Sequence, residues 1–576
     1  MSVQPSIIDP GATPARQKLS LLHGPVDPPL VDLTLGELLE LQTYQHGGRE
    51  CLVIPWTGAR WTYHELNQQS SALARALLDM GVGTGDRVGI MAGNCEQYAA
   101  VFFAAAKIGA VLVILNNTYT PSEAMYGLTF TNCRVFFTTN KIGRNDQATL
   151  LAELANEGDG PQVVMLRGEA GGYLTYDQLI KSGSRKGHEK LYTAMSRVLP
   201  HQVVNLQFTS GTTGSPKAAS LTHHNLVNNS RFIGDRMRLT PDDVLCCPPP
   251  LFHCFGLVLG LLAVITHGGT IVYPAEVFDI PATLRAISDE SCTAIHGVPA
   301  MFDSLFQATL PPNFACDRLR TGIIAGAPVP RYLMELLVNR FGMREFTSSY
   351  GLTEASPTCF NAFTDDALTK RLTTVGTLMP HAHAKIVDRE GRIVPVGQKG
   401  ELCIAGYQLQ AGYWNNSEKT NEAMVRDAAG VLWLHTGDEA VFDENGYCSI
   451  TGRFKDIIIR GGENIYPLEI EERLAAHPSI SRAIVVGLKD EHYGEVVGAF
   501  LQHMGHGRPK PNDQEVRAWV RGRLGNHKAP SHVFWLGEGL VPEAVPLTGS
   551  GKVRKFEMAQ LGNEILQRQR SDAPRL

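Results

Sequence analysis

The nine residues from Thr209 to Lys217, Thr-Ser-Gly-Thr-Thr-Gly-Ser-Pro-Lys, constrain the fold more than any other part of this chain. They follow an apolar run, 203–208, that has the length and composition of a buried strand. Glycines let backbone N–H groups approach phosphate oxygens closely, hydroxyls add neutral donors, and a lysine adds a point charge. The sequence therefore predicts a phosphate-binding loop at the end of a buried strand.

The kinase-type P-loop, G-x-x-x-x-G-K-[ST], does not describe this loop. Gly211 and Gly214 are three residues apart, Pro216 precedes the lysine, and Ala218 stands where that motif has Ser or Thr. A solvated Gly/Ser turn is the alternative for any run of this composition. Because nine consecutive positions fit, we favour a phosphate loop of another class.

Alternating helix and strand patterns surround the loop. Thr62 and Glu65 form a capping box before a helix that runs towards Met80, and Gly81 is placed to end that helix. The glycines of 81–85 follow a helix and precede a strand, which is the reverse of a dinucleotide fingerprint, so we interpret them as a turn. The alternation predicts a buried parallel sheet with a strand at 87–91, a helix at 96–108 and a strand at 110–115.

The pattern changes twice along the chain. Residues 385–446 alternate short β-like runs with Gly, Asn and Asp turns, which predicts a smaller β subdomain. We expect an α/β fold: a large N-terminal domain of parallel-sheet αβ subdomains and a β subdomain, then a small α+β C-terminal domain. The expected boundaries are a proline-rich flexible tail at 1–30, the N-terminal domain at 31–455 and the C-terminal domain at 456–576.

Composition excludes several classes of partner. Lys and Arg number 52 against 57 Asp and Glu, so the formal charge of −5 gives no reason to expect nucleic acid. The 11 cysteines include no C-x-x-C pair, which is typical of a reducing compartment. Two long apolar runs contain His253 and Lys107, respectively, and both are too short to predict a membrane span. Composition leaves the oligomeric state open.

Three polar motifs follow strand-like runs and suit a nucleotide. Tyr350 offers an aromatic ring to adenine, Thr353 a hydroxyl to a phosphate oxygen, and Glu354 a carboxylate to Mg²⁺. Asp438, in His-Thr-Gly-Asp, suits two sugar hydroxyls, and Arg453 suits ribose or phosphate. Taken singly, each motif has a solvated turn as its alternative.

In this order, the motifs resemble those of the adenylate-forming enzymes: acyl-CoA synthetases, peptide-synthetase adenylation domains and firefly-type luciferases. The resemblance covers residues 35–560. It implies that ATP is held by Thr209, Ser210, Gly211, Thr212, Thr213, Gly214, Ser215, Pro216, Lys217, Gly326, Ala327, Pro328, Ser349, Tyr350, Gly351, Thr353, Asp438, Arg453 and Lys552, with Thr213 and Glu354 as Mg²⁺ ligands. Ser349 replaces the Asn or Gly that the family often has, so one adenine contact stays open.

The resemblance also implies the catalytic group, the acyl pocket and a moving domain. It assigns catalysis to Lys552, Thr353, Glu354 and His253, and places Lys552 at the α-phosphate and the substrate carboxylate. Lys455 falls at the family's hinge, after which the C-terminal domain is mobile. The acyl and CoA channel then comprises His253, His296, Gly297, Val298, Gly461 and Gly462. From spacing alone, His253 would be a structural residue before an apolar helix.

The implied reaction is that of an acyl-CoA synthetase: a carboxylic acid and Mg·ATP give an acyl-adenylate and pyrophosphate, and CoA then displaces AMP. Alternatives are an enzyme that loads a carrier-protein thiol, although no carrier domain is visible, a luciferase-like oxygenase, and an inactive ATP-binding scaffold. The chain most resembles the medium-chain-like branch, with a fungal secondary-metabolite or siderophore ligase as a specific possibility. Medium-chain fatty acids, aryl acids and short branched hydroxy acids such as mevalonate stay open.

The two ends carry partial targeting motifs. Arg16 and His23 have the spacing of the amino-terminal peroxisomal signal R-[LVI]-x5-[HQ]-[LA], although Gln17 and Gly24 depart from it. The last three residues, Pro-Arg-Leu, resemble S-K-L with proline in the first place. A peroxisomal or a cytoplasmic location is therefore expected.

Overall fold

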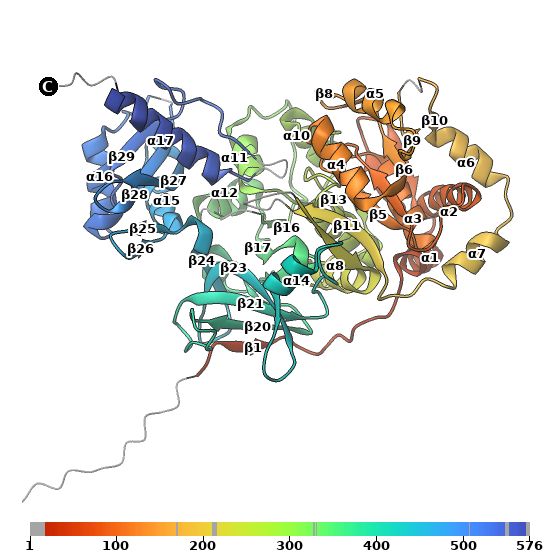
Figure 1. The fold of residues 1–576 in the computed structure, drawn as a ribbon, viewed down its shortest axis with the longest axis horizontal. Helices are drawn as coiled ribbons and strands as arrows, with labels where there is room; N and C mark the ends of the chain where they lie inside the picture. Colours follow the sequence, from red (N-terminus) through yellow and green to blue (C-terminus); the bar gives the residue numbers. More distant parts are fainter. Residues whose placement is uncertain are drawn as a thin grey trace, which may run out of the picture.

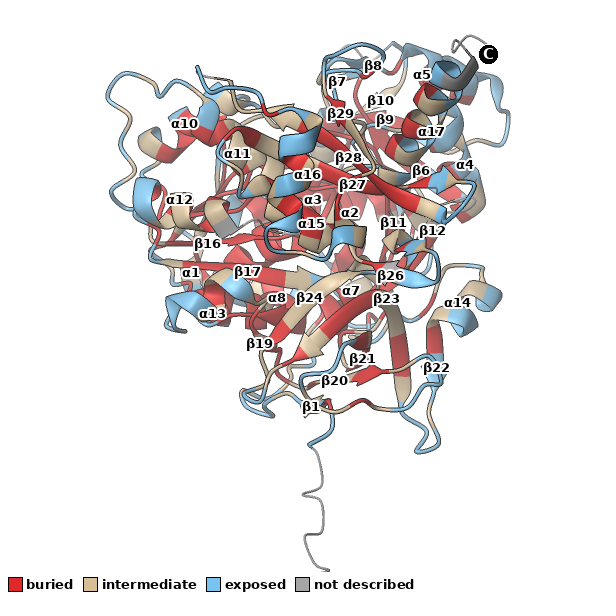
Figure 2. Ribbon diagram, turned by 90° about the vertical axis from the view of Figure 1, so that its left-hand side faces the viewer, coloured by how far each residue is buried: buried red, intermediate tan, exposed pale blue. Residues whose placement is uncertain are grey.

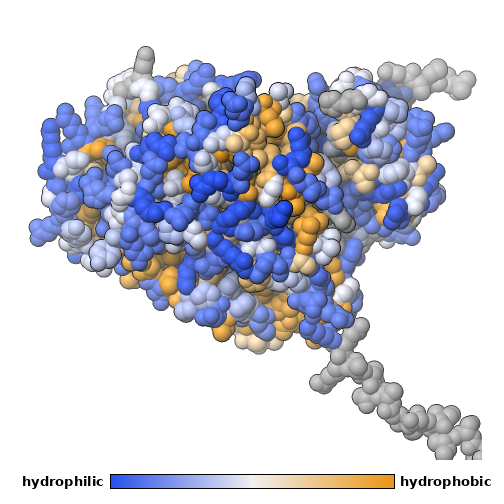
Figure 3. Space-filling view, turned by 180° about the vertical axis from the view of Figure 1, so that it is seen from behind, coloured by the Kyte–Doolittle hydropathy of each residue, from blue (hydrophilic) through white to orange (hydrophobic). Residues whose placement is uncertain are grey.

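The computed structural model describes residues 18–168, 171–209, 216–326, 329, 331–505, 507–547 and 552–571. The described residues form two large sheets, a smaller β subdomain and a C-terminal domain (Figure 1). Within the described residues, no helix is long and apolar enough to cross a membrane. The face in Figure 3 is largely hydrophilic, with separate hydrophobic patches.

The first sheet carries the predicted phosphate loop. Its strands are parallel except for the last pair, in which β12 runs antiparallel to β11 with Thr209 opposite Lys217. Both expected strands before the loop, at 87–91 and 110–115, are present and adjacent. The spatial order is β10 (Leu174–Thr175), β9 (Gln162–Met165), β6 (Cys133–Thr138), β4 (Arg87–Ile90), β5 (Val111–Ile114), β11 (Val203–Thr209) and β12 (Lys217–Thr222).

The second sheet is parallel at its centre and antiparallel at its two edges. Its carboxyl ends include the Tyr-Gly-x-Thr-Glu motif, which begins in β17. The order is β19 (Thr377–Leu378), β18 (Thr358–Asn361), β17 (Glu345–Gly351), β16 (Thr321–Ile324), β15 (Ala294–Ile295), β13 (Val244–Cys246), β14 (Thr270–Val272), β2 (Glu50–Ile54) and β3 (Ala59–Thr62).

Helices pack between and around the two sheets, and the buried strands form the centre of the molecule (Figure 2). The predicted capping box is present: the Thr62 hydroxyl accepts from the Glu65 N–H, and Gly81 has φ +80° just past the helix. The largest apolar cluster joins strands of both sheets to α1 (Leu35–His46), α2 (Tyr63–Asp79), α3 (Glu96–Lys107), α8 (His223–Met237), the π-helix Phe255–Leu262 and α9 (Ala263–His267).

The remaining elements complete these two subdomains. They are α4 (Pro121–Thr131), β7 (Lys141–Ile142), β8 (Asn145–Asp146), α5 (Ala148–Asn156), α6 (Tyr176–Ser184), α7 (Glu189–Met195), α10 (Ile280–Asp289), α11 (Pro299–Gln307), α12 (Arg331–Phe341), the 3-10 turn Thr353–Ala355 and α13 (Leu368–Thr373).

The predicted β subdomain is an antiparallel sheet. It contains β1 (Leu21–His23), β20 (Ala382–Val387), β21 (Gly400–Gly406), β23 (Leu432–Phe442), β22 (Met424–Arg426) and β24 (Cys448–Arg453), with α14 (Ser417–Ala423) beside them. The apolar residues on one face of this sheet join the same main cluster as the two large sheets, and those on the other face form a small cluster of their own. The β subdomain is therefore continuous with the N-terminal body.

We expected a flexible tail at residues 1–30, and this expectation is wrong for residues 18–30, the part that the structure describes. Strand β1 pairs antiparallel with β20, and His23 lies opposite His383 with their Nδ1 atoms 2.9 Å apart. A strand of three residues has too little periodicity to be found in the sequence, and its partner is more than three hundred residues away. Arg16 and the last three residues lie outside the described residues, so the targeting interpretation stays a prediction.

The C-terminal domain has its own sheet and two apolar clusters. One cluster lies under α15 (Pro467–Ala475) and α16 (Asp513–Arg521), and the other under α17 (Lys555–Ser571). Both clusters contain only residues after 457, which agrees with the expected division, although the boundary at 455 stays a prediction. The strands are β26 (Glu463–Ile465), β25 (Ile458–Arg460), β28 (Gly494–His503), β27 (Ile480–Asp490) and β29 (His532–Trp535).

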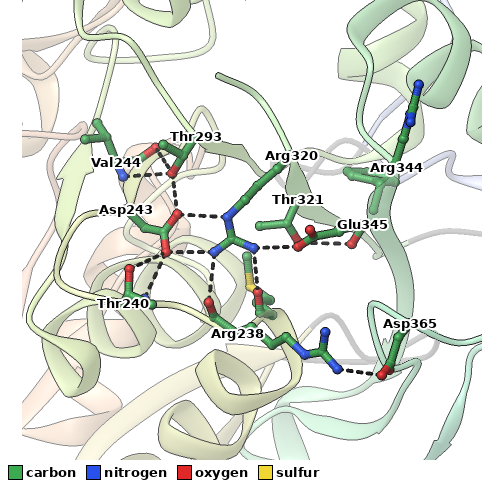
Figure 4. Close-up of polar contacts among 12 residues, drawn as sticks. Arg238, Thr240, Asp243, Val244, Thr293, Arg320, Thr321, Arg344, Glu345 and Asp365 are labelled. Atoms are coloured by element: carbon green, nitrogen blue, oxygen red, sulfur yellow. Dashed lines mark hydrogen bonds and ion pairs between the residues drawn. The ribbon is translucent and has the colours of Figure 1, made fainter. Parts of the chain in front are cut away.

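Arg320 joins the amino ends of the strands in the second sheet (Figure 4). Its Nη2 lies 2.7 Å from Asp243 Oδ2 and its Nη1 2.7 Å from Glu345 Oε2. It also donates to the backbone oxygens of Met237 and Arg238 at the end of α8. Burial raises the pKa of Asp243, but bonds from Arg320 and Thr293 outweigh it and hold that pKa below the usual value.

We expect Arg320→Met to destabilise this sheet by about 3 kcal/mol at neutral pH, because Asp243 would stay buried and charged without its partner. The pKa of Asp243 is lowered in the folded state, so its contribution is complete above the ordinary aspartate pKa and is lost as pH falls through the lowered value. The melting temperature at neutral and acidic pH measures both effects.

Asp365→Asn is the matched control. Asp365 pairs with Arg238 in the same network, but its side chain is 63% exposed, so we expect a change of at most about 0.5 kcal/mol. An equal loss of stability in both variants would contradict the role given to Arg320.

Candidate active site

The predicted phosphate loop connects β11 to β12. Thr209 ends β11 and Lys217 begins β12, so the loop leaves the sheet at the carboxyl end of β11, as expected. The Lys217 ammonium lies 5.0 Å from the ring centroid of Tyr413. The other loop residues assigned to ATP, Ser210, Gly211, Thr212, Thr213, Gly214 and Ser215, lie outside the described residues; Pro216 is described and immediately precedes β12.

Glu354 lies on a 3-10 turn just past β17. The Tyr413 hydroxyl donates to its Oε1 at 2.8 Å, and its backbone oxygen accepts from the Gln410 N–H. Thr353, on the same turn, bonds the Cys254 side chain. A carboxylate oxygen at this place suits Mg²⁺, which prefers oxygen ligands. The second predicted metal ligand, Thr213, is outside the described residues.

Asp438 brings together the predicted adenine and ribose residues. Its side chain is 4% exposed and accepts from the Tyr350 hydroxyl at 2.6 Å and from Arg453 Nε at 2.7 Å. Tyr350 is the next-to-last residue of β17, whereas Arg453 ends β24, opposite Asp438 in β23. The structure therefore assembles three motifs that are far apart in the sequence into one hydrogen-bonded group.

Other residues assigned to ATP shape the backbone here. The Ser349 hydroxyl donates to the Phe360 backbone oxygen at 3.0 Å, so it ties β17 to β18. A Cβ at Gly351 would lie 2.0 Å from the Pro357 oxygen, which excludes any side chain. Gly326 has φ +87° beside Val298. The next two predicted residues, Ala327 and Pro328, lie outside the described residues.

Lys552 and His253 meet at this site from opposite domains. Burial and the charge of Arg453 lower the pKa of Lys552, whereas the charges of Asp438 and Glu354 act in the opposite direction. Burial and the charge of Lys552 lower the pKa of His253 to about 3, so its imidazole is neutral at physiological pH. The His253 Nδ1 accepts from the Phe255 N–H at 3.1 Å.

His296 lies in the core beside the predicted acyl pocket. Its Nε2 donates to the Leu259 oxygen at 3.0 Å and its Nδ1 accepts from the Ile323 N–H at 3.1 Å, so both nitrogens are used by the backbone. Burial lowers its pKa to about 4. A Cβ at Gly297 would come within 2.8 Å of the Phe302 ring. His296 thus positions this segment, and a direct substrate contact stays a prediction.

The two predicted parts of the C-terminal domain occupy different places. Lys552 faces the nucleotide residues, while Gly461 and Gly462 are exposed, with φ of +59° and +88°. A Cβ at Gly462 would meet nothing within 4 Å. The predicted hinge residue, Lys455, lies on the 3-10 turn Phe454–Asp456 between the two domains.

Comparison with known proteins decides the family. The model of the AMP-binding enzymes matches residues 39–414, and the model of their C-terminal domain matches 469–552. The chain belongs to the AMP-binding enzymes. The predicted membership among adenylate-forming enzymes is thereby confirmed.

Similar proteins match this AMP-binding enzyme over nearly its whole length. The acyl-CoA ligase sidI of Beauveria bassiana is 80% identical over 98% of each chain. A protein of the same name from Aspergillus fumigatus is 60% identical over 96% of this chain and 95% of its own. The crystal structure of the anthranilate CoA ligase AuaEII with anthranoyl-AMP has a TM-score of 0.82 at 22% identity, covering 94% of this chain and 99% of that one, which supports the fold.

Sequence reasoning missed some residues of this AMP-binding enzyme's site. Tyr413 contacts both Glu354 and Lys217, and Glu401 lies beside the loop that carries Asp438. Both lie in the region interpreted only as β turns and strands. The only local signal at Glu401 is a charged residue directly before the apolar run 402–405. Nothing in the sequence places Tyr413 opposite the phosphate loop.

We expect pyrophosphate release by this enzyme to fall on the alkaline side, because the lowered pKa of Lys552 makes its charge titrate below the ordinary lysine range. The dependence of kcat/KM on pH between about 7 and 10 reports the free enzyme. Lys552→Arg should remove that fall, since a guanidinium stays protonated there. An unchanged alkaline limb in Lys552→Arg would assign the limb to another group.

Proposed function

We propose that this protein is an ATP-dependent acyl-CoA ligase: a carboxylic acid reacts with ATP to give an acyl-adenylate and pyrophosphate, and the thiol of CoA then displaces AMP. The observation that carries the proposal is that Lys552 of the C-terminal domain is buried within electrostatic reach of Asp438, Arg453 and Glu354 of the N-terminal domain. A basic residue next to a nucleotide-type site suits the charge that develops when a carboxylate attacks the α-phosphate. The relatives named acyl-CoA ligase support the same reaction.

In this proposal each residue binds or neutralises charge, and no enzyme nucleophile is needed. Asp438 accepts from ribose hydroxyls, and Tyr350 presents its ring to adenine while its hydroxyl stays on Asp438. Lys552 holds its proton at Nζ and faces the reacting phosphate and carboxylate. Glu354 and Thr213 would hold Mg²⁺, which supplies charge neutralisation to the phosphates.

The acid that we propose is short. By resemblance, the segment around Gly297 sets the depth of the acyl pocket. The Phe302 ring fills the space behind Gly297, and Phe255 lies 5.5 Å from the buried His296. We infer from these two rings that the acyl pocket is shallow, so that a short or branched acid, hydroxylated or not, fits it better than a medium-chain fatty acid does. CoA is favoured over a carrier protein because the relatives are named for CoA.

We expect the domain position to separate the two half-reactions. Lys552→Ala removes the charge that meets the developing negative charge, so adenylation should fall by several orders of magnitude, as about 3–5 kcal/mol implies. Thioester formation from supplied acyl-adenylate and CoA should survive. Single-turnover assays of each half-reaction, with Mg²⁺ present, measure the two rates. An equal loss in both halves would contradict the assignment of Lys552 to adenylation.

Gly462→Leu should show the reverse pattern. A Cβ at Gly462 would meet no other atom within 4 Å, so a leucine is accommodated in this domain position and pyrophosphate release in the first turnover should stay nearly intact. Thioester formation should be blocked, because it needs the close backbone approach that glycine permits. Gly505→Leu is the matched control, because Gly505 also has a positive φ, +69°, and open space around it. A thioester defect of the same size in Gly505→Leu would show that backbone strain alone causes it.

A panel of acids tests the proposed pocket. We expect kcat/KM to fall once a straight chain exceeds the pocket, by about tenfold or more per added methylene. Phe302→Leu should move the optimum to longer acids. Phe346→Leu is the control, because Phe346 is equally buried and packs against Phe302 at 5.6 Å but does not lie against Gly297. A preference for medium-chain acids in the unaltered enzyme would contradict the proposal.

A further inference from the structure

The loop that carries Asp438 is a bulge in β23. Glu401 of β21 lies opposite Glu439, and Cys403 lies opposite His435. Between these two pairs β21 has one residue, Leu402, whereas β23 has three, residues 436–438. The two extra residues interrupt the ladder of backbone hydrogen bonds and turn Asp438 towards Tyr350 and Arg453.

The Glu401 carboxylate fills the interrupted part of this ladder. Its Oε2 accepts from His435 Nδ1 at 2.8 Å, and its Oε1 accepts from the Gly437 N–H at 3.2 Å. One side chain therefore holds both the residue before the bulge and the residue at its tip. Gly437 has φ +70°, which glycine adopts without strain but to which it is not confined, so partners are needed to keep the bulge in one conformation.

The rest of the bulge is held by Thr436. Its hydroxyl donates to the Leu402 oxygen at 2.8 Å and accepts from the Asp438 N–H at 3.1 Å. Thr436 therefore links the bulge to Leu402 of β21 and to Asp438, while Glu401 holds His435 and Gly437. The Glu401 side chain is 26% exposed and the His435 side chain is 31% exposed, so their contact does not lie in the buried core. Their place beside Asp438 points to the nucleotide rather than to stability.

We propose that Glu401 is a positioning residue for nucleotide binding, which acts by holding the bulge that aims Asp438. It touches no substrate. When Glu401 accepts from Gly437 and His435, the Asp438 carboxylate keeps the direction in which it meets Tyr350 and Arg453. Without Glu401, Gly437 is free to leave its left-handed conformation and Asp438 loses its fixed direction. The inference rests on one part of the proposed function, namely that Asp438 binds the ribose hydroxyls of ATP.

Binding of ATP without any acid tests the proposal, so a wrong choice of acid does not affect it. Calorimetry compares ATP with 2′-deoxyATP and 3′-deoxyATP on the unaltered enzyme, Glu401→Ala and Asp438→Ala. One of the two deoxy compounds lacks a hydroxyl that Asp438 binds, and ATP should bind the unaltered enzyme more tightly than this compound does. In Glu401→Ala we expect the ratio of these two affinities to shrink about 10-fold, as for loss of a hydrogen bond to a charged group. Binding of that deoxy compound should change little. Glu401→Ala combined with Asp438→Ala should lose no further preference.

A second measurement needs no ligand. Hydrogen exchange of the Gly437 amide should become faster in Glu401→Ala, because its acceptor is removed, while exchange in the rest of β23 is kept. Glu401→Gln, which keeps one oxygen acceptor, should lie between the two. Asp427→Asn is the matched control: Asp427 accepts from Trp433 Nε1 at 2.8 Å at the other end of the same strand. It should leave ribose preference unchanged.

Two results would overturn the proposal. One is a Glu401→Ala variant that binds ATP and both deoxy compounds more weakly by the same factor, which indicates a general loss of fold. The other is unchanged protection of Gly437. If instead Asp438→Ala keeps the full ribose preference while Gly437 loses protection in Glu401→Ala, then the ribose role of Asp438 fails and the hold of Glu401 on the bulge stands.

Discussion

The buried carboxylate of Asp438 is the interaction on which the rest of the site depends. A charge with only 4% of its side chain exposed must be hydrogen-bonded, and Tyr350 and Arg453 supply these bonds from two different sheets. Because Arg453 is directly followed by the turn that leads to the C-terminal domain, the same carboxylate fixes where that domain starts. The position of Lys552 follows from this attachment and from the packing of the second domain.

The candidate binding residues lie at the ends of strands. Thr209 and Tyr350 lie at the carboxyl ends of β11 and β17, where side chains of parallel strands leave the sheet. The amino ends of the second sheet are tied by Arg320 instead (Figure 4). The candidate binding groups and the Arg320 network therefore lie at opposite ends of the second sheet.

The charged groups that act on Lys552 of the C-terminal domain come from the N-terminal body. Burial and then the charge of Arg453 lower the pKa of Lys552, and the charges of Asp438 and Glu354 act in the opposite direction. A phosphate and a carboxylate in the site would add negative charge and stabilise the ammonium further. In the proposed function, the ammonium of Lys552 is therefore stabilised most when ATP and the acid are both bound.

Much of this protein is determined locally by its sequence. Short stretches of sequence suffice to predict the phosphate loop, the Thr62–Glu65 capping box and the alternation that forms the parallel sheets. The motifs that contain Tyr350, Glu354 and Asp438 are likewise recognised from adjacent residues. The tertiary structure decided the rest. Pairing of β1 with β20, the contact of Tyr413 with Glu354 and the bulge held by Glu401 join segments that no local pattern connects. They follow from burial of apolar faces, which sets strand neighbours only when the whole chain has packed.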